Sequence, residues 1–211
     1  MGDYSLVQFL ERGKMMRNQH RSNPAPSTVS SSVRTRDYLT TREIDALMAA
    51  ARQSSRYGHR DATMILLGYR HGLRAAELCD LQWSQVELAA GRLHVRRVKS
   101  GTPSVHPLRG DEIRALRRLQ REQAASPQVF SSERGGPMRP KSFHGLFARI
   151  GERAGLPFPV HPHMLRHGCG FALANAGHDT RALQAWLGHK NIQHTVRYTE
   201  LAPDRFKNFW R

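Results

Sequence analysis

Residues 161–198 have the sequence HPHMLRHGCGFALANAGHDTRALQAWLGHKNIQHTVRY. Apolar side chains recur at helical spacing through three successive parts of this stretch, at 162–176, 180–187 and about 191–199. Asp179 or Thr180 can cap the second of these helices, and Gly188 can end it. The pattern therefore predicts three short helices joined by tight turns.

The first of these helices combines a core stripe with a basic face. Its predicted core positions are Leu165, Cys169, Ala172, Leu173 and Ala176. Pro162 suits a first helical position. At about 100° per residue, His163 and His167 lie opposite the stripe and Arg166 lies at its margin. His163 and Arg166 can face one ligand together, although a solvated basic face explains the spacing equally well. For His167, a solvated position or a structural hydrogen bond is the favoured interpretation.

His161, His163 and His167 also have a spacing that metal ligands can adopt. No Asp, Glu or Cys close by completes such a set, because both cysteines fall in apolar helical patterns. We therefore expect no metal site here.

His189 and Tyr198 follow within ten residues of each other. His189 is predicted at the turn just past a helix end, where it could simply bind helix carbonyls. On the last helix the expected inward stripe is Ile192, Val196 and Thr199, which turns Tyr198 away from the core. A phenol of pKa ~10 is a poor nucleophile unless cations stabilise its anion. Two Arg, a Lys and two His of this chain could supply those cations.

The upstream residues predict a helical domain with one hairpin. Thr40 and Glu43 have capping-box spacing at the start of the first helix, and further helices are expected at 60–69, 74–83, 110–124 and about 140–154. Between them, 92–98 and 103–108 alternate like two strands around the turn 99–102. The region 129–138 leaves room for one edge strand at most. The fold class that follows is mainly α with a small antiparallel β-sheet.

The amino-acid composition is strongly basic, which favours a partner of opposite charge. The 211 residues include 33 Lys and Arg against 17 Asp and Glu, a formal net charge of +16. Such a field attracts polyanions, nucleic acid first among them. Two cysteines are too few for a disulfide framework, and neither a membrane-spanning run nor a signal peptide is evident. These features predict a soluble cytoplasmic protein.

Two parts of the chain differ in composition. Residues 1–37 form a basic arm that ends in the Pro/Ser-rich stretch SNPAPSTVSSS, at 22–32, and this stretch is expected to be flexible. Residues 38–211 hold the helical patterns and are expected to form one compact domain.

Five motifs in this order resemble the tyrosine recombinases of the phage integrase family. They are GLRAAEL at 72–78, Lys99 in the hairpin, HMLRH at 163–167, LGH at 187–189, and Tyr198. The wider stretches, including the hairpin KSG…HPL, are similar to the short fimbrial phase-variation recombinases that invert a promoter element. The resemblance runs from about Tyr38 to Trp210 and implies the catalytic domain of that family.

The resemblance implies a role for each matching residue. Tyr198 would attack DNA to form a 3′-phosphotyrosine link, and Arg74 and Arg166 would bind the non-bridging oxygens. Lys99 would protonate the leaving 5′ oxygen. His163 would be the general base and His189 would hydrogen-bond the phosphate. Glu77 would orient Arg74, and no metal ion, ATP or other cofactor is implied.

The implied partners are double-stranded DNA and further copies of this chain, four protomers acting on two DNA sites in the bacterial nucleoid, with no membrane. Arg139, Lys141 and Lys190 are the expected DNA contacts. Larger members of the family carry an N-terminal DNA-clamping domain, which the 1–37 arm is too short and too linker-like to supply. The fimbrial subgroup also lacks that domain. The tail RFKNFWR, at 205–211, could pack on its own domain or on a neighbouring protomer. A non-cutting DNA-binding regulator and a type IB topoisomerase remain the alternative functions.

Overall fold

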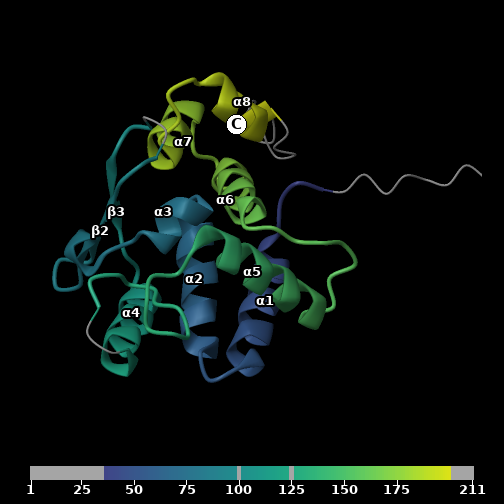
Figure 1. The fold of residues 1–211 in the computed structure, drawn as a ribbon. Coiled ribbons are helices and arrows are strands. Elements are labelled where there is room, and N and C mark those ends of the chain that lie inside the picture. The colour runs from purple at the N-terminus through teal and green to yellow at the C-terminus, as the bar shows by residue number, and fades with distance from the viewer. Residues whose placement is uncertain (1–35, 99–100, 124–125, 201–211) are drawn as a thin grey trace, which may run out of the picture. The chain divides into compact units, whose positions relative to one another are not determined.

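The computed structural model describes residues 36–98, 101–123 and 126–200. In these ranges the chain forms eight α-helices, one 3₁₀ turn and a small sheet (Figure 1). The elements are α1 Thr41–Ser54, α2 Gly58–Arg70, α3 Ala75–Cys79, η1 Trp83–Gln85, β1 Val86–Glu87, β2 Arg92–Val95, β3 Ser104–Pro107, α4 Gly110–Glu122, α5 Pro140–Arg153, α6 His163–Asn175, α7 Thr180–Leu187 and α8 Gln193–Glu200. The predicted mainly α fold with a small antiparallel sheet is confirmed.

Helix α1 begins with the predicted capping box. The Thr40 amide donates to Glu43 Oε2 over 2.8 Å, and the Glu43 amide donates back to Thr40 Oγ1 over 3.4 Å. These two bonds satisfy backbone donors that a helix start otherwise leaves unpaired. The start of the described domain is therefore set by local sequence.

The sheet runs in the order β1-β2-β3 with antiparallel pairing. Leu93 pairs with His106 and Val95 with Ser104, which confirms the hairpin, although its strands are shorter than the predicted 92–98 and 103–108. The third strand, β1, was not predicted. The region 129–138, which left room for one edge strand at most, forms no named strand and contributes only the isolated bridge Ser131–Pro137.

The predicted helix 74–83 is also wrong in its second half, because α3 ends at Cys79. Beyond it, Gln82 forms a β-bridge with Gln128, and the Trp83 amide donates to the Pro127 carbonyl over 3.0 Å. Pairing with a distant segment thus replaces the local helical bonds at this point.

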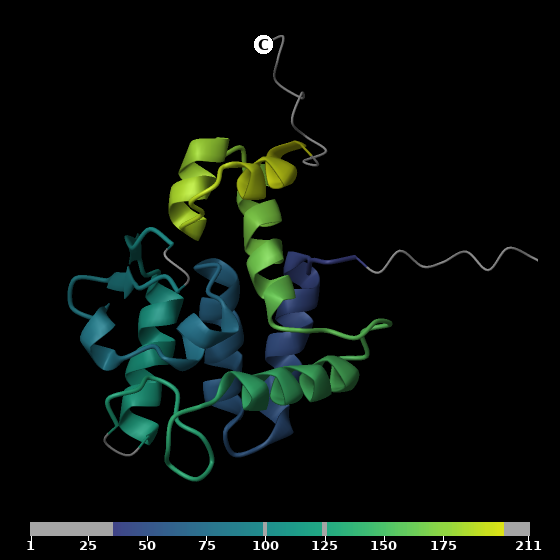
Figure 2. The ribbon, with the colours of Figure 1, turned by 45° about the horizontal axis from the view of Figure 1, so that its top comes forward.

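Two hydrophobic clusters hold the described residues together. The larger includes side chains of α1 to α5 and the sheet. The smaller joins α6, α7 and α8, and its buried members are Cys169, Phe171, Ala174, Leu183, Leu187 and Tyr198. Figure 2 shows α6 between the α1–α2 pair and the two C-terminal helices.

Because α6 is packed on several sides, its burial differs from the predicted stripe. All residues from Met164 to Phe171 are buried, whereas Ala176, expected in the core, is exposed. Arg166 and His167, placed by periodicity at the margin and on the far side, are therefore interior residues. Both cysteines are buried and unpaired, as expected.

The turn between α2 and α3 lies against α7 because residue 72 is a glycine. Gly72 has φ +57°, and a Cβ there would lie 2.5 Å from Leu187 Cδ2. A side chain would therefore be strained and would also clash. This close approach brings Arg74, at the start of α3, next to the end of α7.

In the described part of the chain, no helix combines the length and the apolar composition that crossing a bilayer requires.

Candidate active site

One open pocket of about 410 Å³ gathers five of the six predicted catalytic residues. Arg74 comes from the start of α3, His163 and Arg166 from α6, His189 from the turn after α7, and Tyr198 from α8. Its other lining residues are His167, Gln193, His194 and Arg197. The sixth predicted residue, Lys99, lies outside the described residues. Motifs that are far apart in the sequence thus converge on one cavity.

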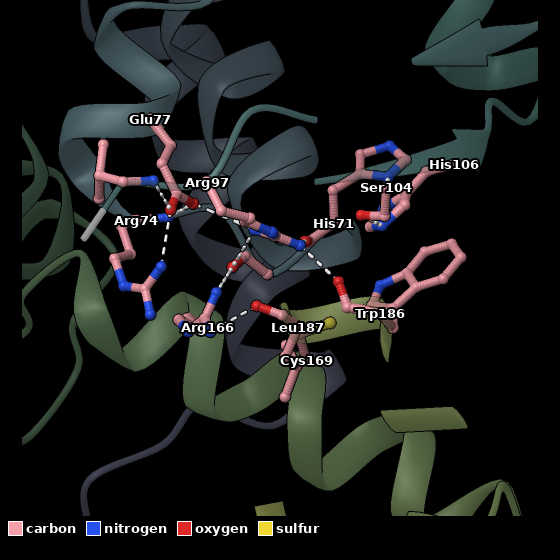
Figure 3. A network of polar contacts seen from close by, with 12 residues as sticks. His71, Arg74, Glu77, Arg97, Ser104, His106, Arg166, Cys169, Trp186 and Leu187 are labelled. Atoms are coloured by element: carbon pink, nitrogen blue, oxygen red, sulfur yellow. Dashed lines mark hydrogen bonds and ion pairs between the residues drawn. The ribbon is translucent and has the colours of Figure 1, made fainter. Parts of the chain in front are cut away.

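Glu77 organises the α3 side of the pocket (Figure 3). Its carboxylate accepts hydrogen bonds from Arg74 Nη1 over 2.7 Å, from the Arg74 amide over 2.9 Å and from Arg97 Nη1 over 3.0 Å. Burial opposes ionisation of Glu77, but these bonds and the charges of both arginines bring its pKa below the usual value. The expected orienting role of Glu77 toward Arg74 agrees with these contacts.

Arg97 is a buried cation that the sequence interpretation missed. Besides Glu77, its guanidinium donates to the carbonyl oxygens of Gly72, His71 and Trp186, so it joins the hairpin to α2 and α7. Its Nε has no partner among the described residues. Strand alternation could have identified it. Leu93, Val95 and Arg97 are alternate residues and all three are buried.

Arg166 is 1% exposed and is held by backbone carbonyls rather than by a carboxylate. Nη1 donates to the Gly72 carbonyl, and Nη2 donates to the Leu187 carbonyl over 2.7 Å. Burial and the neighbouring charges of Arg74 and Arg97 lower its pKa from 12.5 to about 10. The group therefore stays charged near neutral pH.

The site has an excess of positive charge. Among the described residues, Glu77 pairs with both Arg74 and Arg97, whereas Arg166 contacts no carboxylate. One negative charge therefore stands against three guanidinium charges. Unpaired buried charge is costly. An anion in the pocket would stabilise the charged arrangement.

His189 faces this charge from the turn after α7. Gly188, with φ +65°, ends α7 in the left-handed conformation, as predicted. His189 Nδ1 lies 2.8 Å from Thr195 Oγ1 of α8. Burial, followed by the charges of Arg166 and Arg74, lowers the pKa of His189 to about 3. The ring is therefore neutral at physiological pH.

The predicted orientation of α8 is wrong. Its buried residues are Thr195 and Tyr198, whereas Ile192, Val196 and Thr199 are partly exposed. Counting only aliphatic side chains as inward-facing misled the prediction. Thr195 is buried because its hydroxyl contacts His189, and the ring of Tyr198 belongs to the smaller hydrophobic cluster.

The hydroxyl of Tyr198 contacts a neighbour that the sequence interpretation set aside. His167 Nδ1 lies 2.8 Å from Tyr198 Oη. Burial raises the pKa of Tyr198 above 10, and this effect outweighs the opposing charges of Arg197 and Arg166. The expectation that clustered cations would make this phenol acidic therefore does not hold in the DNA-free chain.

His163 occupies the exposed side of the same cluster. Its ring meets His167 edge-on, with centroids 4.4 Å apart. Partial burial and the charge of Arg166 lower its pKa. His163 and Arg166 do face the same pocket, as their spacing suggested.

The three predicted DNA contacts are exposed and lie on two elements. Arg139 and Lys141 flank the start of α5, and Lys190 follows His189. Arg139 also lines a separate cavity of about 690 Å³ together with Arg134 and Arg149. No observation tests their binding role, which stays a prediction.

A second group of buried histidines lies beside Arg97 (Figure 3). His71 Nε2 is 2.9 Å from Glu112 Oε1, and His71 Nδ1 is 3.1 Å from His106 Nδ1. Trp186 stacks on His106 with ring centroids 3.8 Å apart. Burial and the proximity of His71 lower the pKa of His106 to about 3.

Comparison with known proteins gives matches along most of the chain. Residues 37–205 match the phage integrase family. The chain is 43% identical over 181 residues to the type 1 fimbriae regulatory protein FimE of Escherichia coli K12, covering 83% of this chain and 91% of FimE. It is 32% identical to the tyrosine recombinase XerD of Ralstonia nicotianae, covering 86% of this chain and 61% of XerD. The crystal structure of the XerA recombinase superposes with a TM-score of 0.68 at 25% identity, over 82% of this chain and 63% of XerA.

The buried histidines predict a loss of stability in mild acid. His106, His167 and His189 each have a pKa of about 3 in the folded chain, against about 6.5 when unfolded. Below pH 6.5 the unfolded chain therefore binds more protons, and stability falls as the pH decreases. Each histidine contributes up to about 1.4 kcal/mol per pH unit, or roughly 4 kcal/mol per unit for all three. Urea unfolding at pH 7.5, 6 and 5 measures this slope.

His106→Gln should reduce the loss of stability between pH 7.5 and 5 by about 2 kcal/mol, since one titrating group is removed. His144→Gln on α5 is the matched control, because His144 is exposed. The buried carboxylates Glu77 and Glu112 have lowered pKa values, so their own contribution is lost only below about pH 4.5. A stability that stays constant down to that pH would contradict the assignment of neutral buried histidines.

Proposed function

Because the chain belongs to the phage integrase family and is a tyrosine recombinase, we propose that it inverts a segment of double-stranded DNA by way of a 3′-phosphotyrosine intermediate on Tyr198. Inversion follows from the likeness to the fimbrial regulator FimE, which spans most of both chains. Integration or excision of a segment would use the same chemistry with differently arranged sites.

The observation that carries the proposal is the unpaired positive charge in the pocket that Tyr198 lines. Arg74 and Arg166 present guanidinium groups there. Glu77 supplies a single negative charge beside Arg74, Arg97 and Arg166. A phosphodiester carries one negative charge and two non-bridging oxygens, which suits the planar donors of arginine. The site therefore fits the backbone of DNA better than it fits a neutral substrate.

In the proposed reaction, Arg74 and Arg166 hold the non-bridging oxygens and stabilise the pentacoordinate transition state. His189 donates a hydrogen bond to the phosphate from Nε2, since Thr195 Oγ1 occupies its Nδ1. In a neutral ring this needs the Nε2–H tautomer, in which the Thr195 hydroxyl donates to Nδ1. The residues of this chain thus supply the electrostatic stabilisation that a metal ion gives in other phosphoryl-transfer sites.

Tyr198 Oη attacks phosphorus as the bond to the 5′ oxygen breaks, and Lys99 gives a proton to that leaving oxygen. The family resemblance assigns the proton of the phenol to His163. The energy of the broken bond is retained in the tyrosyl ester, so a 5′ hydroxyl of the exchanged strand can reverse the step without ATP.

Recombination needs two DNA sites, for which we propose four protomers, with the exposed Arg139, Lys141 and Lys190 on the phosphate backbone. Residues 1–35 of the arm and the tail at 205–211 lie outside the described residues. The protein would act on bacterial DNA in the cytoplasm.

Substitution of Tyr198 by Phe removes the nucleophile and should abolish covalent capture of DNA. On a nicked suicide substrate, the wild-type chain should yield an adduct that survives denaturing electrophoresis. The Tyr198→Phe chain should bind the same DNA and yield none. A persistent adduct would mean that another residue attacks.

Substitution of Lys99 by Ala should slow cleavage of ordinary DNA by about 10²–10⁴-fold, the usual contribution of a general acid. A 5′-bridging phosphorothiolate places a good leaving group at the cut, so the acid is no longer needed. Lys99→Ala should cleave that substrate at a rate within about tenfold of wild type. Such a difference is smaller than the usual contribution of a general acid. Absence of rescue would remove Lys99 from this role.

A plasmid that carries a promoter between the protein's native inverted repeats distinguishes three activities. They are DNA recombination, transcriptional regulation without cutting, and relaxation of supercoils. The wild-type chain should invert the enclosed segment, as read by restriction mapping, and Tyr198→Phe should not. Promoter repression without inversion would favour a non-cutting regulator. Relaxation of supercoils without any sequence requirement would favour a type IB topoisomerase.

A further inference from the structure

We infer that His167 is the general base that takes the proton of Tyr198 when DNA is cut. This inference rests on the proposed function, because it assumes that Tyr198 is the nucleophile. It gives a chemical role to a buried histidine for which a structural hydrogen bond was the favoured interpretation, and it replaces the assignment of that role to His163.

The contacts of His167 decide which partner carries the proton. Nδ1 lies 2.8 Å from Tyr198 Oη and 3.2 Å from Arg197 Nη2. A guanidinium can only donate, so Nδ1 must be an unprotonated acceptor and the ring must carry its hydrogen on Nε2. The Tyr198 hydroxyl is then the donor. The proton that must leave during attack already points at a ring nitrogen.

Tyr198 belongs to the smaller hydrophobic cluster, and His167 is buried beside it. Tyr198 is 1% exposed and His167 is 9% exposed. A Cβ at Gly170 would come within 2.8 Å of the Tyr198 ring, and Phe171 meets that ring edge-on with centroids 5.1 Å apart. Bulk water therefore has little access to the hydroxyl, and a side-chain base is needed within hydrogen-bond reach.

His163 is less well placed to take this proton. Its side chain is exposed, and its ring meets the edge of His167 rather than the phenol. From that position it faces the pocket entrance, where it can contact the phosphate beside Arg74 and Arg166.

The charges around His167 link its basicity to the substrate. The groups that face it are His161, His163 and Arg166 from α6 and the segment before it, and Arg197 and Tyr198 from α8. Burial and the positive members of this group lower its pKa to about 3, so the DNA-free ring is a weak base. A phosphodiester in the pocket offsets those charges and favours the imidazolium.

The protons and bonds of the step balance. The Tyr198 Oη–P bond forms, the bond from phosphorus to the 5′ oxygen breaks, and the phenol proton moves to His167 Nδ1. The leaving oxygen takes a separate proton from the general acid. In religation, His167 returns its proton to the departing Tyr198 oxygen, as microscopic reversibility requires.

The first test needs no substitution. In the full-length wild-type chain labelled with ¹⁵N-histidine, the His167 ring should be the Nε2–H tautomer at pH 7, with Nδ1 unprotonated. A proton on Nδ1 would overturn the inference, because the phenol could not then donate to it.

The second test separates a base from a structural acceptor. His167→Asn keeps an acceptor oxygen near the position of Nδ1 but cannot be protonated there. Single-turnover cleavage at pH 7 should fall by about 10²–10³-fold with little change in DNA affinity, whereas the exposed His178→Asn should match wild type. Unlike Lys99→Ala, the His167→Asn chain should not be rescued by the 5′-bridging phosphorothiolate. Fluorotyrosine at position 198, a more acidic phenol, should restore part of its rate.

A cleavage rate of His167→Asn within about threefold of wild type would overturn the inference, because loss of a general base slows the reaction much more. Full rescue by the phosphorothiolate would also overturn it. If His163→Gln, but not His167→Asn, shows the loss that fluorotyrosine repairs, the base is His163. Failure of the proposed function itself has a different signature, an adduct that still forms with Tyr198→Phe.

Discussion

The guanidinium of Arg166 lies inside the protein with neutral carbonyl groups as its direct partners. Those carbonyls belong to Gly72, on the α2–α3 turn, and to Leu187, the last residue of α7. A buried donor that lost these partners would bear its full desolvation cost, so the α2–α3 turn and the end of α7 are both fixed against α6. The two carbonyl dipoles satisfy two of the five donors of the guanidinium and do not cancel its charge. The same contacts therefore build the fold and leave a positive site facing the pocket.

Arg97 and Glu77 extend this arrangement to the hairpin. Glu77 accepts from Arg74 at the pocket and from Arg97 in the interior, and its Oε1 also accepts from the Val98 amide over 3.1 Å. One carboxylate thus fixes an arginine of the pocket and the backbone at Val98, the residue before Lys99. A Lys at position 97 could not reach the same set of carbonyls, because it lacks the planar donor geometry of arginine. We regard Arg97 as a positioning residue for the hairpin.

The order of the helices could be predicted from the sequence, because it depends on local signals. The five catalytic residues of the pocket were identified by the resemblance of their motifs to the tyrosine recombinases. The Thr40 capping box and the left-handed Gly188 are set within a few residues. The orientation of α8 could not be predicted, since it depends on how Tyr198 packs against α6. The end of α3 likewise depends on pairing with a segment about forty-five residues away. Local periodicity has no access to such contacts, and it therefore misplaced the residues that touch the phenol.

The burial of Tyr198 explains why a reactive nucleophile can belong to the hydrophobic core. Without DNA, the phenol is protonated, its pKa is raised, and its acceptor His167 has a lowered pKa. Burial causes both shifts, but the nearby positive charges add to the lowering at His167 and oppose the raising at Tyr198. A bound phosphate offsets those charges and therefore raises the pKa of His167. An anion therefore does more than fill a charged pocket, since it also makes His167 a stronger base beside the phenol. The substrate that the site attracts is, on this argument, the group that strengthens the base, and in its absence the phenol stays protonated.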